Sequence, residues 1–156
     1  MIYLALGSNI DPKKNIATAI KFLAEKISKI HRAPLYNTKP FGPIKQAEFI
    51  NTAIQGETVL SPRDLFLFVK DIEKRVGRIP REHWGPREID IDIALYDDLI
   101  LDEPDLQIPH AGLHKRDVVL QPLIDLDPTL IHPVLKISLS ELLKNIPLQD
   151  RFILEK

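Results

Sequence analysis

The sequence predicts an α+β fold in which helices pack on an antiparallel sheet. Short apolar or alternating runs, typical of strands, are interspersed with two longer segments of helical periodicity. Their order along the chain is β-α-β-β-α-β, followed by a less regular C-terminal extension. This is the order of the ferredoxin-like, split βαβ fold, whose helices usually cover one face of the sheet.

The first predicted strand and helix span residues 2–27. The apolar run 2–6 stops at Gly7 to Asn9, which predicts a buried strand followed by a turn. Asp11 and Pro12 are typical of an N-cap followed by the first residue of a helix. The apolar residues of this helix recur at helical spacing: Ile16, Ala19, Ile20, Leu23, Ala24 and Ile27.

The second and third predicted strands span residues 30–38 and 49–58. Pro34 lies inside the first of these runs and favours an edge position, because proline cannot donate to a β-ladder. Between the two strands, residues 39–45 contain two prolines and a glycine and predict a loop.

The second predicted helix begins at Ser61-Pro62 and ends near Gly77. Its apolar face consists of Leu65, Phe66, Val69, Ile72 and Val76. A charged loop over 78–86 then leads to a strand over 88–96, and Asp97-Asp98 predicts a turn. Farther on, residues 118–126 predict a short helix, and Ser138 to Glu141 form a possible capping box before a last one.

Composition limits the classes of protein to consider. The 156 residues correspond to one domain, 1–156, with 44% apolar and 28% charged residues. A formal net charge of −1 argues against a general nucleic-acid or membrane-surface binder. The absence of cysteine excludes disulfides, thiolate metal sites and a cysteine nucleophile.

The N-terminal residues lack the basic region and the apolar length of a signal peptide. No apolar stretch approaches the roughly 18 residues that a membrane helix needs. We therefore expect a soluble, cytoplasmic protein without a membrane partner.

The most informative segment runs from Trp84 to Ile93. Because side chains alternate along a strand, Ile89, Ile91 and Ile93 are expected to enter the core. Asp90 and Asp92 then share the other face, with Cα atoms about 7 Å apart. Two carboxylates so close repel each other unless a positive charge lies between them, and Mg²⁺ commonly binds one or two carboxylates together with substrate phosphates.

Several arginines lie near this acidic pair, at positions 75, 78, 81 and 87. Guanidinium groups match phosphate oxygens, so arginines beside metal-binding carboxylates suit a polyphosphate ligand. The alternative is a solvated acidic strand face among ordinary surface charges. Other phosphate-binding signatures are missing, because the sequence contains neither a P-loop nor a dinucleotide-binding glycine motif.

The chain resembles the 6-hydroxymethyl-7,8-dihydropterin pyrophosphokinases over about 130 residues. The longest matching block is Trp84 to Ile93, which is very specific. The other matching pieces lie on both sides of this block and occur along the chain in the order found in the family. They are Ala5 to Asn9, Tyr36 to Thr38, Phe41 to Pro43, Gln46, Phe49 to Asn51, Glu57-Thr58, Ile72-Glu73, Gly77-Arg78, Ile108 to His110, Arg116 and His132-Pro133.

The resemblance implies a magnesium-dependent transfer of pyrophosphate from ATP to the pterin, with release of AMP, in folate synthesis. Asp90 and Asp92 match the aspartates that hold two Mg²⁺ ions, and Arg78 and Arg87 match catalytic, ATP-engaging arginines. The remaining positions implied to contact ATP are Glu73, Arg81, His110 and Arg116. The resemblance also implies a monomer whose partners are these two small substrates.

The pterin-binding positions follow from the same resemblance. Asn51 matches the asparagine that recognises the pterin edge, and Phe49 matches an aromatic that stacks on one face of the ring. Val118 occupies a position where relatives commonly carry phenylalanine, so this chain lacks a stacking ring there. The other implied contacts are Gly7, Thr38, Lys39 and Phe41.

Three alternatives compete with this interpretation. The same fold could bind a pterin or nucleotide as a sensor without turnover, although a sensor has no need of two carboxylates placed for a metal. A phosphotransferase acting on another heterocyclic alcohol is the second alternative. A purely structural module is the third, and it leaves the block 84–93 unexplained.

Overall fold

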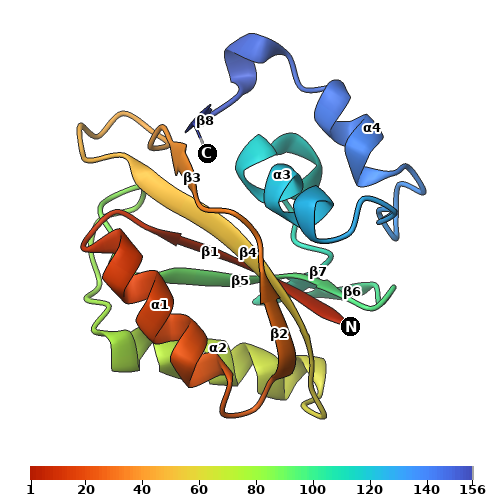
Figure 1. Cartoon of the computed structure of the whole chain (residues 1–156), viewed down its shortest axis with the longest axis horizontal. Helices are drawn as coiled ribbons and strands as arrows, with labels where there is room; N and C mark the ends of the chain where they lie inside the picture. The colour runs from red at the N-terminus through yellow and green to blue at the C-terminus, as the bar shows by residue number, and fades with distance from the viewer. Residues whose placement is uncertain (156) are drawn as a thin grey trace.

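The computed structural model describes residues 1–155 and contains a six-stranded sheet (Figure 1). Its pairings are all antiparallel, in the order β5-β1-β4-β3-β8, and β2 pairs with the other end of β4. The α+β, ferredoxin-like prediction is therefore confirmed. The strands of this sheet are β1 Ile2–Ser8, β2 Ser28–Arg32, β3 Tyr36–Thr38, β4 Phe49–Glu57, β5 Asp90–Tyr96 and β8 Ile153–Glu155.

Helices cover both faces of the sheet, not one as expected. The helices α1 Pro12–Leu23 and α2 Pro62–Val76 lie on one side, and α3 Asp117–Leu126 and α4 Leu139–Lys144 lie on the other (Figure 1). The C-terminal extension covers the second face because it has its own apolar surface, including Leu120, Leu123 and Leu139, which are fully buried. A separate hairpin consists of β6 Leu101–Glu103 and β7 Leu106–Ile108.

Alternation along the strands produces two apolar clusters. Leu4 and Leu6 of β1 pack with α1 and α2 in the first cluster, as do Ile91 and Ile93 of β5 together with Ile89. The predicted inward direction of the three isoleucines is thus confirmed. The second cluster, on the opposite face, includes Tyr3, Ala53, Ala94 and Leu95 with the apolar residues of α3 and α4.

Local signals predicted α2 closely. The Ser61 side chain accepts a hydrogen bond from the Asp64 amide at 3.1 Å, and Pro62 is the first helical residue. Gly77 ends the helix with φ of 114°, a left-handed conformation that suits glycine. Near the C-terminus, the Ser138 hydroxyl likewise accepts from the Glu141 amide at 3.2 Å before α4.

The prediction for α1 needs two corrections. Asp11 precedes the helix but has φ of 42°, and its side chain makes no capping hydrogen bond, because a capping carboxylate reaches the first turn from extended backbone. The helix ends at Leu23, before Ala24 and Ile27. Ile27 nevertheless remains buried in the first cluster.

The single strand predicted over 30–38 is two strands, β2 and β3, separated around Pro34. Proline has no amide hydrogen, so the ladder to β4 stops there and resumes at Tyr36. The strand predicted over 88–96 begins two residues late, at Asp90, because the ladder with β1 extends only to the pair of Gly7 with Asp90. The short strand β8 is an addition that the sequence pattern did not predict.

Candidate active site

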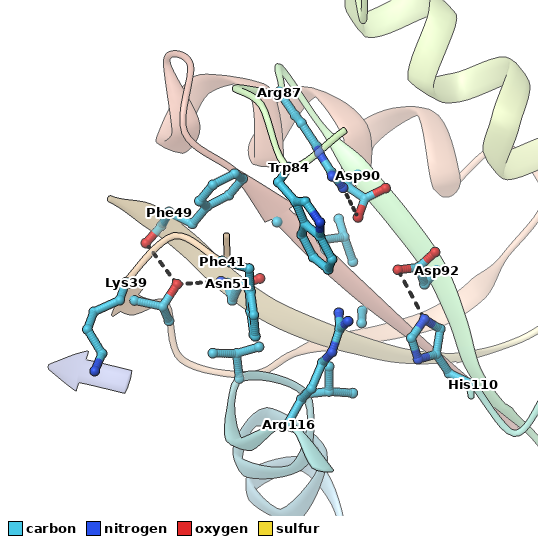
Figure 2. Close-up of a pocket in the computed structure, with 16 residues that line it drawn as sticks. Lys39, Phe41, Phe49, Asn51, Trp84, Arg87, Asp90, Asp92, His110 and Arg116 are labelled. Carbon is cyan, nitrogen blue, oxygen red and sulfur yellow. Dashed lines mark hydrogen bonds and ion pairs between the residues drawn. The ribbon is translucent and has the colours of Figure 1, made fainter. Parts of the chain in front are cut away.

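A pocket opens on the second face of the sheet, between β1, β4, β5 and the start of α3. Strand alternation places small side chains, Ala5 and Gly7, under this pocket, and their larger neighbour Leu6 enters the first core. Its lining, drawn in Figure 2, consists of Ala5, Leu6, Gly7, Thr38, Lys39, Phe41, Phe49, Asn51, Trp84, Arg87, Asp90, Asp92, His110, Arg116, Val118 and Val119.

The acidic pair lies at one end of this pocket, on the same face of β5 (Figure 2). Asp90 is clamped between two arginines, with Oδ1 at 3.0 Å from Arg78 Nη1 and Oδ2 at 3.1 Å from Arg87 Nη1. The two guanidinium groups therefore lie beside the carboxylates, where they could bind the phosphate groups of a polyphosphate ligand.

Asp92 faces His110 at the same end of the pocket (Figure 2). Its Oδ2 lies 3.5 Å from His110 Nε2, and His110 Nδ1 accepts a hydrogen bond from the Gly112 amide at 3.1 Å. This second contact places the proton of a neutral His110 on Nε2, facing the carboxylate. Burial in the pocket, followed by the charge of Asp90, raises the pKa of Asp92. A divalent cation would oppose both effects.

Glu73 lies behind β5, which is the edge strand of the sheet at this side. Its buried carboxylate accepts from the Ile91 amide at 2.8 Å and pairs with Lys70 and with Arg78, at 3.2 and 3.0 Å. Burial raises the pKa of Glu73, although both cations and the amide oppose this. The contacts tie α2 to the backbone between Asp90 and Asp92.

Arg81 lies in the loop before β5 and forms a bidentate pair with Glu88, with both distances at 2.7 Å. The hydrogen bonds from Arg81 lower the pKa of Glu88 to about 2. Arg81 is therefore engaged outside the pocket in this conformation.

A short hydrogen-bond relay orients the side chain of Asn51 (Figure 2). The Thr38 hydroxyl donates to the Phe49 carbonyl at 3.4 Å and accepts from Asn51 Nδ2 at 2.7 Å. Because the hydroxyl proton is used toward Phe49, the amide nitrogen of Asn51 must face Thr38. A Cβ atom at Gly7 would lie 2.6 Å from Asn51 Oδ1, so only glycine accommodates this orientation.

Aromatic groups form the outer wall of the pocket. The Phe41 and Trp84 rings lie 6.0 Å apart with 30° between their planes, and the Arg116 guanidinium lies 4.8 Å from the centre of Phe41. Val118, on α3, supplies an aliphatic surface. A flat aromatic ligand would thus contact ring faces on this side and the Asn51 amide at its edge.

Two loops around the pocket are joined through Asn9. Its Nδ2 donates to Gln46 Oε1 at 2.9 Å, and its Oδ1 accepts from the Arg87 amide at 2.9 Å. Gln46 Nε2 in turn donates to the Trp84 carbonyl at 2.6 Å. The end of β1 thereby connects the loop after β3 with the loop before β5.

All the predicted site residues line the pocket except Glu73, Arg78 and Arg81. These three line an adjoining hollow together with Lys70, Lys74 and His83, so their contacts with ATP stay predictions. The pocket is also lined by Trp84, Ala5, Leu6 and Val119, which the sequence did not mark as site residues. Trp84 could have been found, because it is the single tryptophan of the sequence and opens the most specific block.

The acidic pair fits a hard divalent cation that takes most of its ligands from water and substrate and only a few from the protein. Within residues 1–155, no group of three or more histidine, aspartate or glutamate side chains is arranged to hold a metal ion. Two carboxylates with open space beside them suit Mg²⁺, which completes its octahedron with water and phosphate oxygens.

Comparison with known proteins decides the family. Residues 3–128 match the family model of 7,8-dihydro-6-hydroxymethylpterin-pyrophosphokinase, HPPK. The chain belongs to the HPPK family. A 2-amino-4-hydroxy-6-hydroxymethyldihydropteridine pyrophosphokinase from Aquifex aeolicus is 41% identical over 141 residues, covering 90% of this chain and 88% of the relative. One from Pseudomonas aeruginosa is 38% identical, over 85% and 83%.

Some relatives of this HPPK chain are much longer. The folic acid synthesis protein fol1 of Schizosaccharomyces pombe is 41% identical over 94% of this chain, which corresponds to 20% of that protein. The HPPK-DHPS structure of Plasmodium falciparum has the same fold, with a TM-score of 0.68 at 18% identity over 92% of this chain and 43% of that one. None of the helices described in the HPPK chain is both long and apolar enough to cross a membrane.

Proposed function

We propose that this chain carries out the HPPK reaction in the pocket described above. It transfers the pyrophosphoryl group of ATP to the hydroxymethyl group of 6-hydroxymethyl-7,8-dihydropterin, a step of folate synthesis. The observation that carries the proposal is that one pocket contains two different kinds of binding surface. One end is a slot of aromatic and amide groups, and the other is an acidic pair flanked by arginines.

The pterin occupies the slot between Phe49, Phe41 and Val118, with its edge against Asn51. The amide supplies both a donor and an acceptor, as a pterin edge requires, and Thr38 fixes which is which. Gly7 lets the ligand approach the backbone, and Lys39 lies at the rim.

ATP lies on the other side of the acidic pair. A second hollow shares Asp92 and His110 with the pterin pocket and extends past Lys70 and Gln107. Nucleotide in this hollow would direct its phosphates toward Asp92, with Arg116 and Arg87 on the pterin side. Arg78 and Arg87 would exchange Asp90 for phosphate oxygens, which match the guanidinium geometry equally well.

Asp90 and Asp92 are the residues that would hold the two Mg²⁺ ions. Metal ions held there would supply positive charge to neutralise the phosphates. The protein contributes rigidity, because Glu73 and Lys70 hold the Ile91 backbone between the two carboxylates. In this arrangement Glu73 acts on ATP through Asp90 and Arg78, in addition to the direct contact predicted from the sequence.

The transfer forms one bond and breaks one bond at the β-phosphorus of ATP. The pterin hydroxymethyl oxygen forms a bond to the β-phosphorus, the bond from that phosphorus to the α,β-bridging oxygen breaks, and AMP departs with this oxygen. The hydroxyl proton passes to solvent or, through a bound water, to Asp92. Positioning and charge neutralisation supply most of the acceleration.

In this proposal residues 1–156 act as a single catalytic domain and as a monomer, as the family resemblance implies. Its partners are the two small substrates, and nucleic acid is not among them.

Product analysis tests the proposal. The purified protein is incubated with ATP, Mg²⁺ and 6-hydroxymethyl-7,8-dihydropterin, and the nucleotides are separated. We expect AMP to appear one-for-one with pterin diphosphate and to stop on addition of EDTA. Asp92→Ala should lower kcat/KM by about a thousandfold or more.

Asp98→Ala is the matched control, since Asp98 is exposed in the turn after β5. Formation of ADP in place of AMP would replace the proposal with simple phosphoryl transfer. Tight pterin binding without turnover would replace it with a sensor.

A further inference from the structure

The last described residues, 151–155, run beside the pterin pocket and form what we term the C-terminal strap. Strand β8 of this strap pairs with β3, so that Ile153 lies opposite Thr38. The Lys39 amide donates to the Phe152 carbonyl at 2.8 Å. The strap therefore hydrogen bonds to the segment that supplies Thr38 and Lys39 to the pocket. It lies beyond residue 128, where the match to the family model ends.

A buried carboxylate attaches the strap to the opposite wall. Asp117 is 1% exposed, and its two oxygens accept hydrogen bonds from the Phe152 amide, both at 3.0 Å, and from the Ile153 amide at 2.9 Å. A buried carboxylate requires such donors, and in the described structure the strap supplies them. The neighbours of Asp117 in the chain, Arg116 and Val118, both line the pocket.

The side chain of Phe152 completes the connection. Its ring stacks on Phe41, with centroids 3.9 Å apart and planes 16° apart, and Lys39 Nζ lies 5.2 Å from its centre. Phe152 itself does not line the pocket, whereas Phe41 and the Arg116 guanidinium beside it do. Phe41 is thus held between the strap and Arg116.

The strap has an additional anchor at its start. Arg151 Nε donates to the Ile146 carbonyl at 3.1 Å, and its Nη2 donates to the Leu143 carbonyl at 3.0 Å. These bonds attach residue 151 to the end of α4. The strap is consequently tied to α4, α3 and β3 within five residues.

We propose that Phe152 and Asp117 are positioning residues for the pterin: the C-terminal strap holds Phe41 and the 38–41 segment in the binding conformation before the ligand arrives. The proposal rests on the proposed function, because it assigns the pterin to this pocket. Its physical basis is preorganisation. Because the 38–41 segment is already ordered before the pterin binds, binding does not carry the entropic cost of ordering it.

Replacement of Phe152 tests the strap through two measurements. Phe152→Ala removes the stack, so amide exchange of residues 38–42 in the ligand-free protein should accelerate by about two- to tenfold. The dissociation constant for 6-hydroxymethyl-7,8-dihydropterin, read from Trp84 fluorescence, should rise by a similar factor. The KM for ATP should change less than about twofold, and Phe152→Tyr, which keeps the ring, should restore both values.

Two further variants complete the design. Leu148→Ala is the control, because Leu148 is in the same C-terminal region but is 80% exposed. The two carboxylate oxygens of Asp117 accept three hydrogen bonds from strap amides, whereas an asparagine side chain has one acceptor oxygen. Asp117→Asn should therefore also accelerate amide exchange of residues 38–42.

Unchanged exchange in Phe152→Ala would overturn the proposal. So would equal weakening of pterin and ATP binding together with a lower Tm, since that is the result of a general loss of structure. Faster exchange with an unchanged pterin dissociation constant would also overturn the role in binding. If the wild-type protein bound no pterin while exchange still responded, the proposed function would fail, and the strap would stand as a positioning element of the pocket alone.

Discussion

The two faces of the sheet are built from the same strands and have opposite properties. Toward α1 and α2, β1 and β5 present large aliphatic side chains such as Leu4, Leu6 and Ile91, which are buried almost completely. Toward α3, the same strands present Ala5, Gly7 and the two aspartates. The first face is packed throughout, whereas the second leaves a pocket beside its own apolar cluster.

The difference shows how one sheet divides stability from chemistry. Strand alternation sends consecutive residues to opposite faces, so a single sequence can specify a close-packed core and an open polar site over the same length. Residues on the first face are expected to determine the free energy of unfolding. Those that line the pocket on the second face are expected to determine binding and turnover.

The largest expected effect on stability comes from the first face. Leu4→Ala should lower the free energy of unfolding by about 2–5 kcal/mol, because it removes a fully buried side chain from a close-packed cluster. Chemical denaturation measures the change. Asp92→Ala, on the second face, should leave the denaturation midpoint unchanged or higher, since it removes one of two repelling carboxylates. A comparable loss of stability in both variants would contradict the division between the faces.

A smaller effect is expected from the floor of the pocket. Gly7→Ala places a Cβ atom 2.6 Å from Asn51 Oδ1 and forces the amide to turn, so the pterin dissociation constant should rise about tenfold. Calorimetric titration measures the constant. In an Asn51→Ala background the same substitution should have little effect, because no amide remains to be displaced. An equal effect in both backgrounds would show that Gly7 acts independently of Asn51.

The smallest expected effect is a pH dependence of stability, which should arise from a histidine on the second face of the sheet. His132, between α3 and α4, accepts hydrogen bonds at Nδ1 from the Val134 and Leu135 amides, at 3.2 and 3.1 Å. Burial, followed by the charge of His114, lowers the pKa of His132 below its usual 6.5. The unfolded chain therefore binds the proton more readily, so stability should fall as pH drops below about 6.5 and level off at the folded pKa.

Thermal unfolding between pH 5 and pH 7 checks this sign. His132→Asn keeps an acceptor but cannot titrate, so its Tm should depend less on pH than that of the wild-type protein. His31→Asn, at an exposed histidine of β2, should retain the full dependence. If the two variants behaved alike, His132 would not be the group responsible.

Much of the fold could be predicted because its signals are local. Ser61 and Gly77 delimit α2 through hydrogen bonds and dihedral angles within a few residues of each. The direction of Asp90 and Asp92 follows from alternation within one strand. The resemblance in turn brought together residues that pattern analysis could not connect, such as Gly7, Asn51 and Arg116.

Other features were not predictable, because they depend on contacts between distant parts of the chain. The ladder between β1 and β5 extends only to the pair of Gly7 with Asp90, so β5 starts later than its alternation predicts. Glu73 looks like a surface charge on α2, yet it is buried against Ile91. Trp84 enters the pocket with a positive φ of 65°, which no local rule anticipates for tryptophan.

The sequence by itself determined the β-α-β-β-α-β order of the first 96 residues, the two faces of β5 and, through its motifs, the family and the residues expected at the site. Only the tertiary structure decided that the C-terminal extension covers the second face, that Phe152 stacks on Phe41, and that Arg78 and Arg87 share Asp90. The physical reason is that periodicity and capping act within a turn or a strand, whereas these contacts form only when segments that can be more than a hundred residues apart pack together.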